Sequence, residues 1–167
     1  MAIWVGADFD AAEWAAWWPA LHAALPGERL LRERTPADAQ EIDIALVANP
    51  PAGSLRGLPA LRLVQSLWAG IDRLLADPDL PLHVPLARMV DPLMTEAMAQ
   101  TALWAVLALH RNCFDYAAQQ REGRWQHHPQ RRVDEVRVAV LGLGEMGCSC
   151  ARRLADLGHK YWTTLVS

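Results

Sequence analysis

The sequence lacks the features that mark secreted and nucleic-acid-binding proteins. It has only three cysteines in 167 residues, and an odd number of thiols argues against a disulfide framework. The first residues show no basic segment followed by a long apolar run, so we find no signal peptide. The net charge is −3, which excludes the strongly basic surface of a nucleic-acid-binding protein. We therefore expect a cytoplasmic protein without a nucleic-acid partner.

Long apolar runs are also missing. The longest, residues 97–109, is interrupted by Gln100 and Thr101 and is too short to span a bilayer as a helix, so we expect no membrane partner. By contrast, hydrophobic residues make up 52% of the chain, and there are eight tryptophans. Such a composition excludes intrinsic disorder and provides enough apolar surface for a folded core.

Candidate metal ligands are sparse. Cys148 and Cys150 are two residues apart on an expected helix, so their side chains point to different faces. The adjacent histidines, His127 and His128, have no second ligand pair at a usable spacing. We expect no metal site.

The first half of the chain alternates between strand and helix patterns. Apolar runs predict strands at residues 2–7, 43–48 and 61–67, with weaker candidates at 28–34 and 84–88. Helical patterns lie between them, including a short helix over residues 71–76. Strands that alternate with helices are typical of an α/β layer with a parallel sheet.

The first helix is expected to begin at Asp10. Tryptophan and leucine residues then recur every three to four positions, which predicts one apolar face packed in the core. Pro19 leaves two alternatives open, a kink in one helix or the first turn of a second helix. Asp8 and Asp10 could mark a receiver-type metal site, but a helix N-cap explains Asp10 better.

Residues 93–122 contain neither proline nor glycine. This predicts a single helix about 45 Å long at 1.5 Å per residue. Its first part, residues 97–109, is apolar on nearly all sides, so we expect that part to be buried. Residues 123–135 are polar and predict a solvated arm or linker.

A glycine motif follows in its required context. Residues 136–141 predict a strand, Gly142-Leu143-Gly144-Glu145-Met146-Gly147 comes directly after it, and residues 148–157 predict a helix that ends at Gly158. In such a motif the first glycine allows a tight turn. The second lets the backbone approach a pyrophosphate, and the third lets helix and strand pack closely. The helix N-terminus attracts the phosphates. We therefore expect a dinucleotide-binding element.

The next strand of that element is predicted over residues 160–166. In a dinucleotide-binding fold this strand is followed by an acidic residue for the ribose, or by an arginine for a 2′-phosphate. Here the sequence reaches Ser167 without Asp, Glu or Arg. We expect a truncated Rossmann domain.

Several segments together resemble one family. They are Asn49-Pro50-Pro51, the loop Gln65-Ser66-Leu67-Trp68-Ala69-Gly70-Ile71-Asp72, residues 84–98, and Arg121-Glu122-Gly123-Arg124-Trp125. With the glycine motif after them, the chain resembles the D-isomer specific 2-hydroxyacid dehydrogenases, and within them the glyoxylate/hydroxypyruvate reductase A branch.

The resemblance implies a domain order. Residues 1–92 would form a flavodoxin-like, parallel-sheet substrate domain. A long connecting and dimerisation helix over 93–122 and an arm over 123–135 would follow. Residues 136–167 would begin a truncated NAD(P)-binding Rossmann domain.

The resemblance also implies roles. Backbone amides of Trp68, Ala69, Gly70 and Ile71 would bind a substrate carboxylate, and Gly142 to Gly147 would bind NAD or NADP. The long helix, the Trp125 arm and the open edge of the half-Rossmann sheet would form a homodimer or higher oligomer. The substrate would be a small 2-oxo acid.

No catalytic residue is assigned. The arginine, acid and histidine that serve the family would follow residue 167, and His159 lies too early to be that histidine. We expect the 167-residue chain to be inactive by itself. The alternative is a non-catalytic oligomerising remnant or binding module.

Overall fold

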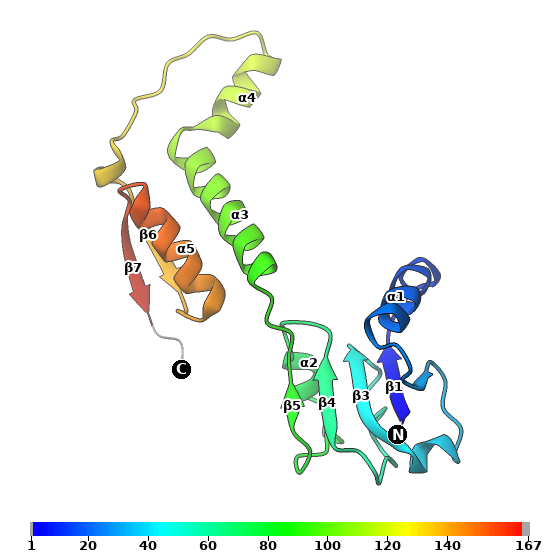
Figure 1. The fold of residues 1–167 in the computed structure, drawn as a ribbon. Helices are drawn as coiled ribbons and strands as arrows, with labels where there is room; N and C mark the ends of the chain where they lie inside the picture. Colours follow the sequence, from blue (N-terminus) through cyan, green and yellow to red (C-terminus); the bar gives the residue numbers. More distant parts are fainter. Residues whose placement is uncertain (1, 165–167) are drawn as a thin grey trace. The chain divides into compact units, whose positions relative to one another are not determined.

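The structure is a computed structural model that describes residues 2–164. It divides into two compact units, one up to Val90 and one from Asp91. The first unit holds a five-stranded sheet in the order β2-β1-β3-β4-β5. The strands are β1 (Ala2–Ala7), β2 (Leu30–Leu31), β3 (Ile42–Ala48), β4 (Leu63–Ser66) and β5 (Leu86–Ala87). Every pairing is parallel, which confirms the predicted α/β class (Figure 1).

The central strands β1 and β3 are apolar because both faces of the sheet are covered. One face packs against a cluster that includes Ile42, Val47 and Val64, and the other packs against a cluster that includes Val5 and Trp14. Strands buried on both faces have nearly continuous apolar sequences, and not an alternating pattern. The outer strands β2 and β5 are only two residues long, shorter than the predicted 28–34 and 84–88.

Helix α1 (Ala11–Ala24) begins where the sequence predicts. The Asp10 carboxylate accepts from the Glu13 amide at 2.8 Å, and the Asp10 amide donates to the Glu13 carboxylate at 2.9 Å. This capping box satisfies two amides that have no partner inside the helix. Pro19 lies inside one continuous helix, so it does not begin a second one.

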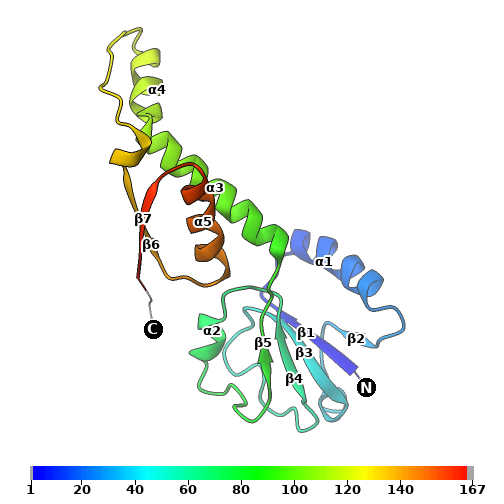
Figure 2. The ribbon, with the colours of Figure 1, turned by 60° about the vertical axis from the view of Figure 1, so that its left-hand side comes forward.

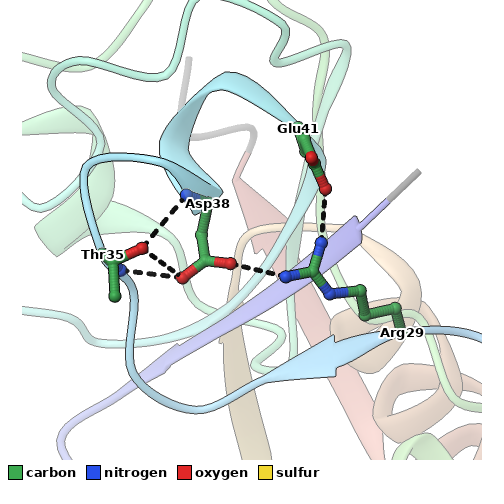
Figure 3. Close-up of polar contacts among 4 residues, drawn as sticks. All are labelled: Arg29, Thr35, Asp38 and Glu41. Carbon is green, nitrogen blue, oxygen red and sulfur yellow. Dashed lines mark hydrogen bonds and ion pairs between the residues drawn. The ribbon is translucent and has the colours of Figure 1, made fainter.

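An ionic cluster fixes the connection between β2 and β3, which includes the 3-10 turn η1 (Asp38–Gln40). The Arg29 guanidinium contacts Glu41 and lies 2.6 Å from Asp38 (Figure 3). The Thr35 hydroxyl and amide also donate to the Asp38 carboxylate, at 2.7 and 2.9 Å. These hydrogen bonds from Thr35, together with Arg29, lower the pKa of Asp38 below its usual value.

The second unit contains α3 (Pro92–His110), α4 (Cys113–Arg121), η2 (Val133–Glu135), β6 (Arg137–Leu141), α5 (Glu145–Asp156) and β7 (Lys160–Thr164). Strands β6 and β7 form a two-stranded parallel sheet. Helix α5 lies between this sheet and α3 (Figure 2). Arg153 of α5 also forms an ion pair with the Glu96 carboxylate of α3.

The expected single helix over 93–122 is wrong. The helix stops at His110 and restarts at Cys113, because Asn112 adopts a left-handed conformation with φ of 54°. Asparagine tolerates this conformation better than most residues. The chain therefore has two shorter helices in place of one long one.

The expected burial of residues 97–109 is wrong over much of that segment. Ala99 and Ala108 are buried, but Trp104 is 62% exposed and Leu109 is 67% exposed. Within residues 2–164, α5 is the main partner of α3, and it covers only one side of that helix. An apolar face of α3 thus remains open in the described chain.

Candidate nucleotide-binding turn and substrate loop

The glycine motif forms a tight turn between β6 and α5. Gly142 directly follows β6 and has a φ of +86°, a conformation that glycine adopts without steric cost. Gly144 is the N-cap of α5, so the helix begins at Glu145, earlier than the predicted Cys148. The motif therefore includes the whole first turn of the helix.

The other two glycines meet opposite surroundings. A Cβ atom at Gly147 would overlap the carbonyl oxygen of Gly142, and it would also contact the Val140 side chain at 3.7 Å. A Cβ atom at Gly144 would meet no atom within 4 Å. Gly147 is thus needed for close packing of the turn, and Gly144 leaves open space at the start of the helix.

This open space lies at the N-terminus of α5, where backbone amides can attract an anion. The first backbone hydrogen bond of α5 runs from the Cys148 amide to the Gly144 carbonyl at 2.9 Å. Amides before Cys148 have no acceptor inside the helix, and they point toward its N-terminus. The side chain of Glu145 is exposed in the same turn, and its negative charge opposes an anionic ligand.

The remainder of a dinucleotide site depends on β7. Its register with β6 runs from Arg137 opposite Lys160 to Leu141 opposite Thr164. Two further residues of the predicted strand, 165 and 166, lie outside the described residues. In the described part, the turn is the candidate for the phosphate portion of such a site.

The candidate substrate loop lies at the carboxyl end of β4. The Ser66 hydroxyl accepts from the Trp68 amide and donates to the Trp68 carbonyl, both at 3.0 Å. The Met89 amide also donates to the Trp68 carbonyl at 3.2 Å. The Trp68 amide is therefore already engaged, and the backbone at this residue is held from two sides.

The other three amides of the loop are different. Within residues 2–164, the amides of Ala69, Gly70 and Ile71 donate to no protein acceptor. Ile71 immediately precedes the short helix α2 (Asp72–Leu75). Successive backbone amides that converge on one point can bind an anion such as a carboxylate.

Sequence reasoning missed three residues that fix this loop. Ser66 holds the Trp68 backbone, and the rings of Phe9 and Trp17 contact the Trp68 ring. A serine two residues before a loop position is a recognisable signal for this kind of turn. The ring contacts join segments far apart in the sequence, so no local pattern could have predicted them.

His159 belongs to neither segment. It is buried after α5, and its ring centroid is 5.5 Å from that of His110. Burial, and then the nearby His110, lower its pKa. The described residues contain no group of three His, Cys, Asp or Glu side chains placed to hold a metal ion. Nor does any helix in residues 2–164 have the length and apolarity needed to cross a membrane.

Comparison with known proteins identifies the family to which the sequence is similar. The NAD-binding domain of D-isomer specific 2-hydroxyacid dehydrogenases matches residues 103–164. A glyoxylate/hydroxypyruvate reductase A from Klebsiella pneumoniae (strain 342) is 40% identical over 147 residues, which cover 85% of this chain and 46% of that protein. The chain belongs to the D-isomer specific 2-hydroxyacid dehydrogenase family.

Solved structures of D-isomer specific 2-hydroxyacid dehydrogenases have the same fold as this chain. One from Xanthobacter autotrophicus Py2, in complex with NADPH, has a TM-score of 0.82 and 37% identity, covering 99% of this chain and 54% of that one. An NADPH-dependent glyoxylate/hydroxypyruvate reductase from Sinorhizobium meliloti, in complex with NADP, has a TM-score of 0.83 and 31% identity, covering 97% and 51%. The family thus uses NAD(P), and the chain spans about half the length of the relatives it matches.

Proposed function

We propose that this chain is the N-terminal part of an NAD(P)H-dependent reductase of small 2-oxo acids, of the glyoxylate/hydroxypyruvate type. The observation that carries the proposal is the turn from Gly142 to Gly147, whose open N-cap position can admit a pyrophosphate. The amides of Ala69 to Ile71 give secondary support, because they can bind the carboxylate of such an acid.

The substrate loop and the glycine turn would bind different parts of the reacting molecules. The loop would hold the substrate carboxylate, and the turn would hold the phosphates of NAD(P)H, which supplies the hydride when it is bound. A reductase also needs a group that donates a proton to the product oxygen, and we assign none in residues 1–167. We therefore propose that these 167 residues alone do not catalyse the reaction.

Amide NMR of the 15N-labelled chain with NADP⁺ tests the turn. We expect weak binding, with a Kd of about 1 mM or more, because the turn supplies only part of the site. Amide shifts should be confined to residues 143–148 and should be lost in Gly144→Trp, which fills the open space. If NADP⁺ does not shift these amides, or shifts them equally in the variant, the proposed cofactor site is overturned.

An assay of glyoxylate reduction by NADPH tests the absence of catalysis. We expect the 167-residue chain to give the same rate as buffer. A rate well above buffer that disappears in Gly144→Trp would contradict the proposed inactivity, while supporting the proposed cofactor site.

We also propose that the chain forms a homodimer through the open face of α3 and α4. A groove of about 360 Å³ there is lined by Trp104, Phe114 and other mostly apolar residues, together with Arg111. Trp125 of the arm is 96% exposed. Large aromatic side chains of this kind are typical anchors of protein interfaces.

Light scattering coupled to size exclusion tests the dimer. We expect a dimer mass that falls to 18.6 kDa in the double variant Trp104→Ser and Leu109→Ser. Leu82→Ser is the matched control, because Leu82 is 91% exposed but lies in the other unit. A monomeric wild-type chain would overturn the proposed interface.

We further propose that the protein is located in the cytoplasm. All three cysteines are free thiols, and thiols stay reduced in that compartment.

A further inference from the structure

Three aromatic rings from separate segments meet at the carboxyl edge of the first unit's sheet. Phe9 follows β1, Trp17 belongs to α1, and Trp68 follows β4. Phe9 and Trp17 are stacked with ring centroids 5.7 Å apart. The Trp68 ring meets both edge to face, at 6.2 Å from Phe9 and 5.9 Å from Trp17. Both arrangements are favourable for aromatic pairs.

This trio is not simply an extension of the core. Trp17 and Trp68 are half-buried, and neither belongs to the two apolar clusters that cover the sheet. Phe9 connects the trio to the core, because its ring lies 5.3 Å from that of the buried Trp14. The trio is therefore a partly exposed aromatic surface with a rigid base.

The trio also borders the candidate anion site directly. Trp68 is the residue before the three free amides of Ala69 to Ile71. Its backbone is fixed by the Ser66 hydroxyl, and its ring is fixed by Phe9 and Trp17. A large ring fixed in the same loop as these amides can limit the room for the rest of a bound acid.

We infer that Trp68 limits the size of the 2-oxo acid that this loop accepts, and that Phe9 and Trp17 are positioning residues for it. The inference rests on the proposed function. The loop would favour 2-oxo acids with two or three carbon atoms and discriminate against those with branched or aromatic tails. Trp17 touches no substrate atom in this account, and it acts only by holding the Trp68 ring.

Helix α1 offers a matched control. Trp18 follows Trp17 and is also half-buried, but its ring partners are Trp14 and His22, at 5.9 and 4.9 Å. Trp17→Leu should therefore free the Trp68 ring, and Trp18→Leu should leave it in place. Trp68→Gly removes the ring itself, and Phe9→Leu is a milder variant that keeps an apolar side chain of similar volume.

The experiment measures binding of two acids to the 15N-labelled 167-residue chain, with pyruvate as the small probe and 4-methyl-2-oxopentanoate as the large one. The amide shifts of Ala69 to Ile71 report the occupancy of the loop. We expect wild type and Trp18→Leu to bind pyruvate about tenfold more tightly than the larger acid. The ratio of the two dissociation constants should fall below about threefold in the variants Trp17→Leu, Phe9→Leu and Trp68→Gly.

The outcomes separate this inference from the proposed function. If both acids shift the loop amides but the ratio is the same in wild type, Trp17→Leu and Trp68→Gly, the size limit is overturned and the carboxylate site stands. If neither acid shifts those amides in wild type, the carboxylate site itself is overturned, and the size limit with it. A change of ratio in Trp18→Leu equal to that in Trp17→Leu would show general loosening of α1 and would overturn the positioning role.

Discussion

At the scale of single residues, the glycine turn depends on two positions for different reasons. A methyl group at Gly147 would overlap the Gly142 carbonyl, so the backbone of the turn would have to move. We expect Gly147→Ala to lower the free energy of unfolding of the second unit by about 1–3 kcal/mol, the usual cost of overpacking. Urea unfolding followed by circular dichroism at 222 nm measures this change.

Gly144→Ala is the control for that prediction. The added methyl group meets open space, so the variant should unfold within about 0.5 kcal/mol of wild type, as surface substitutions usually do. If Gly147→Ala and Gly144→Ala lowered the free energy of unfolding by the same amount, the turn would not be packed as described.

The buried His159 gives the second unit a pH dependence. Its pKa is lowered from an ordinary value near 6.5 by burial and by His110, so the unfolded chain binds a proton more readily than the folded chain. The titratable group next to it is His110, at the end of α3, whose own Nε2 contacts the Arg131 carbonyl at 2.9 Å. The free energy of unfolding is therefore highest above the pKa that His159 has in the unfolded chain. It decreases as the pH falls below that pKa toward the lower pKa of the folded chain.

Thermal melting at pH 7.5 and pH 5.5 tests the effect of His159. We expect the second unit to melt at a lower temperature at pH 5.5, because protonation favours the unfolded chain. His159→Leu removes the titrating group and fills the same apolar site, so most of the difference between the two pH values should disappear. A pH dependence unchanged in His159→Leu would assign the effect to other groups.

At the scale of elements, local patterns predicted the parts that local forces determine. The runs over β1 and β3 are apolar because both faces are buried, and Asp10 and Glu13 cap α1 through their own backbone. The strand, glycine turn and helix of the motif were predicted for the same reason. The short strands β2 and β5 were predicted too long, because their length depends on their neighbours in the sheet.

The break between α3 and α4 could not be predicted from composition. Residues on both sides form helices readily, and no proline or glycine marks the position. The change is confined to Asn112, whose left-handed backbone ends one helix and begins the next. The aromatic trio was missed for a related reason, since Phe9, Trp17 and Trp68 meet only after the sheet has formed.

Asn112 provides a test of the break. We expect Asn112→Gly to keep or slightly raise the stability, because glycine adopts this φ without strain. Asn112→Val should lower the free energy of unfolding by about 1–2 kcal/mol, because a branched side chain at positive φ is costly. Urea unfolding of both variants gives the comparison, and equal stability would argue for a continuous helix.

At the scale of the whole molecule, the two units differ in the size of their sheets and in how much apolar surface they leave exposed. The first has five paired strands, and the second has two strands and a helix face left open in the described residues. Two-stranded sheets are marginally stable without further packing. We expect unfolding in two steps, with the second unit opening first.

Amide hydrogen exchange checks this order. Amides of β1 and β3 should exchange more slowly than those of β6 and β7, with protection factors that differ by at least tenfold, or about 1.4 kcal/mol. A single cooperative transition with equal protection in both sheets would contradict it.

The ring cluster around Trp68 has one more consequence, which concerns light and not chemistry. The Trp17 and Trp68 rings are held 5.9 Å apart in one arrangement, and aromatic rings in fixed packing give circular dichroism in the near ultraviolet. The signal depends on the angle between the Trp17 and Trp68 rings, now 89°. A rotation of the Trp68 ring against Trp17 changes that angle, so this signal reports a rearrangement of the loop without a dye or label.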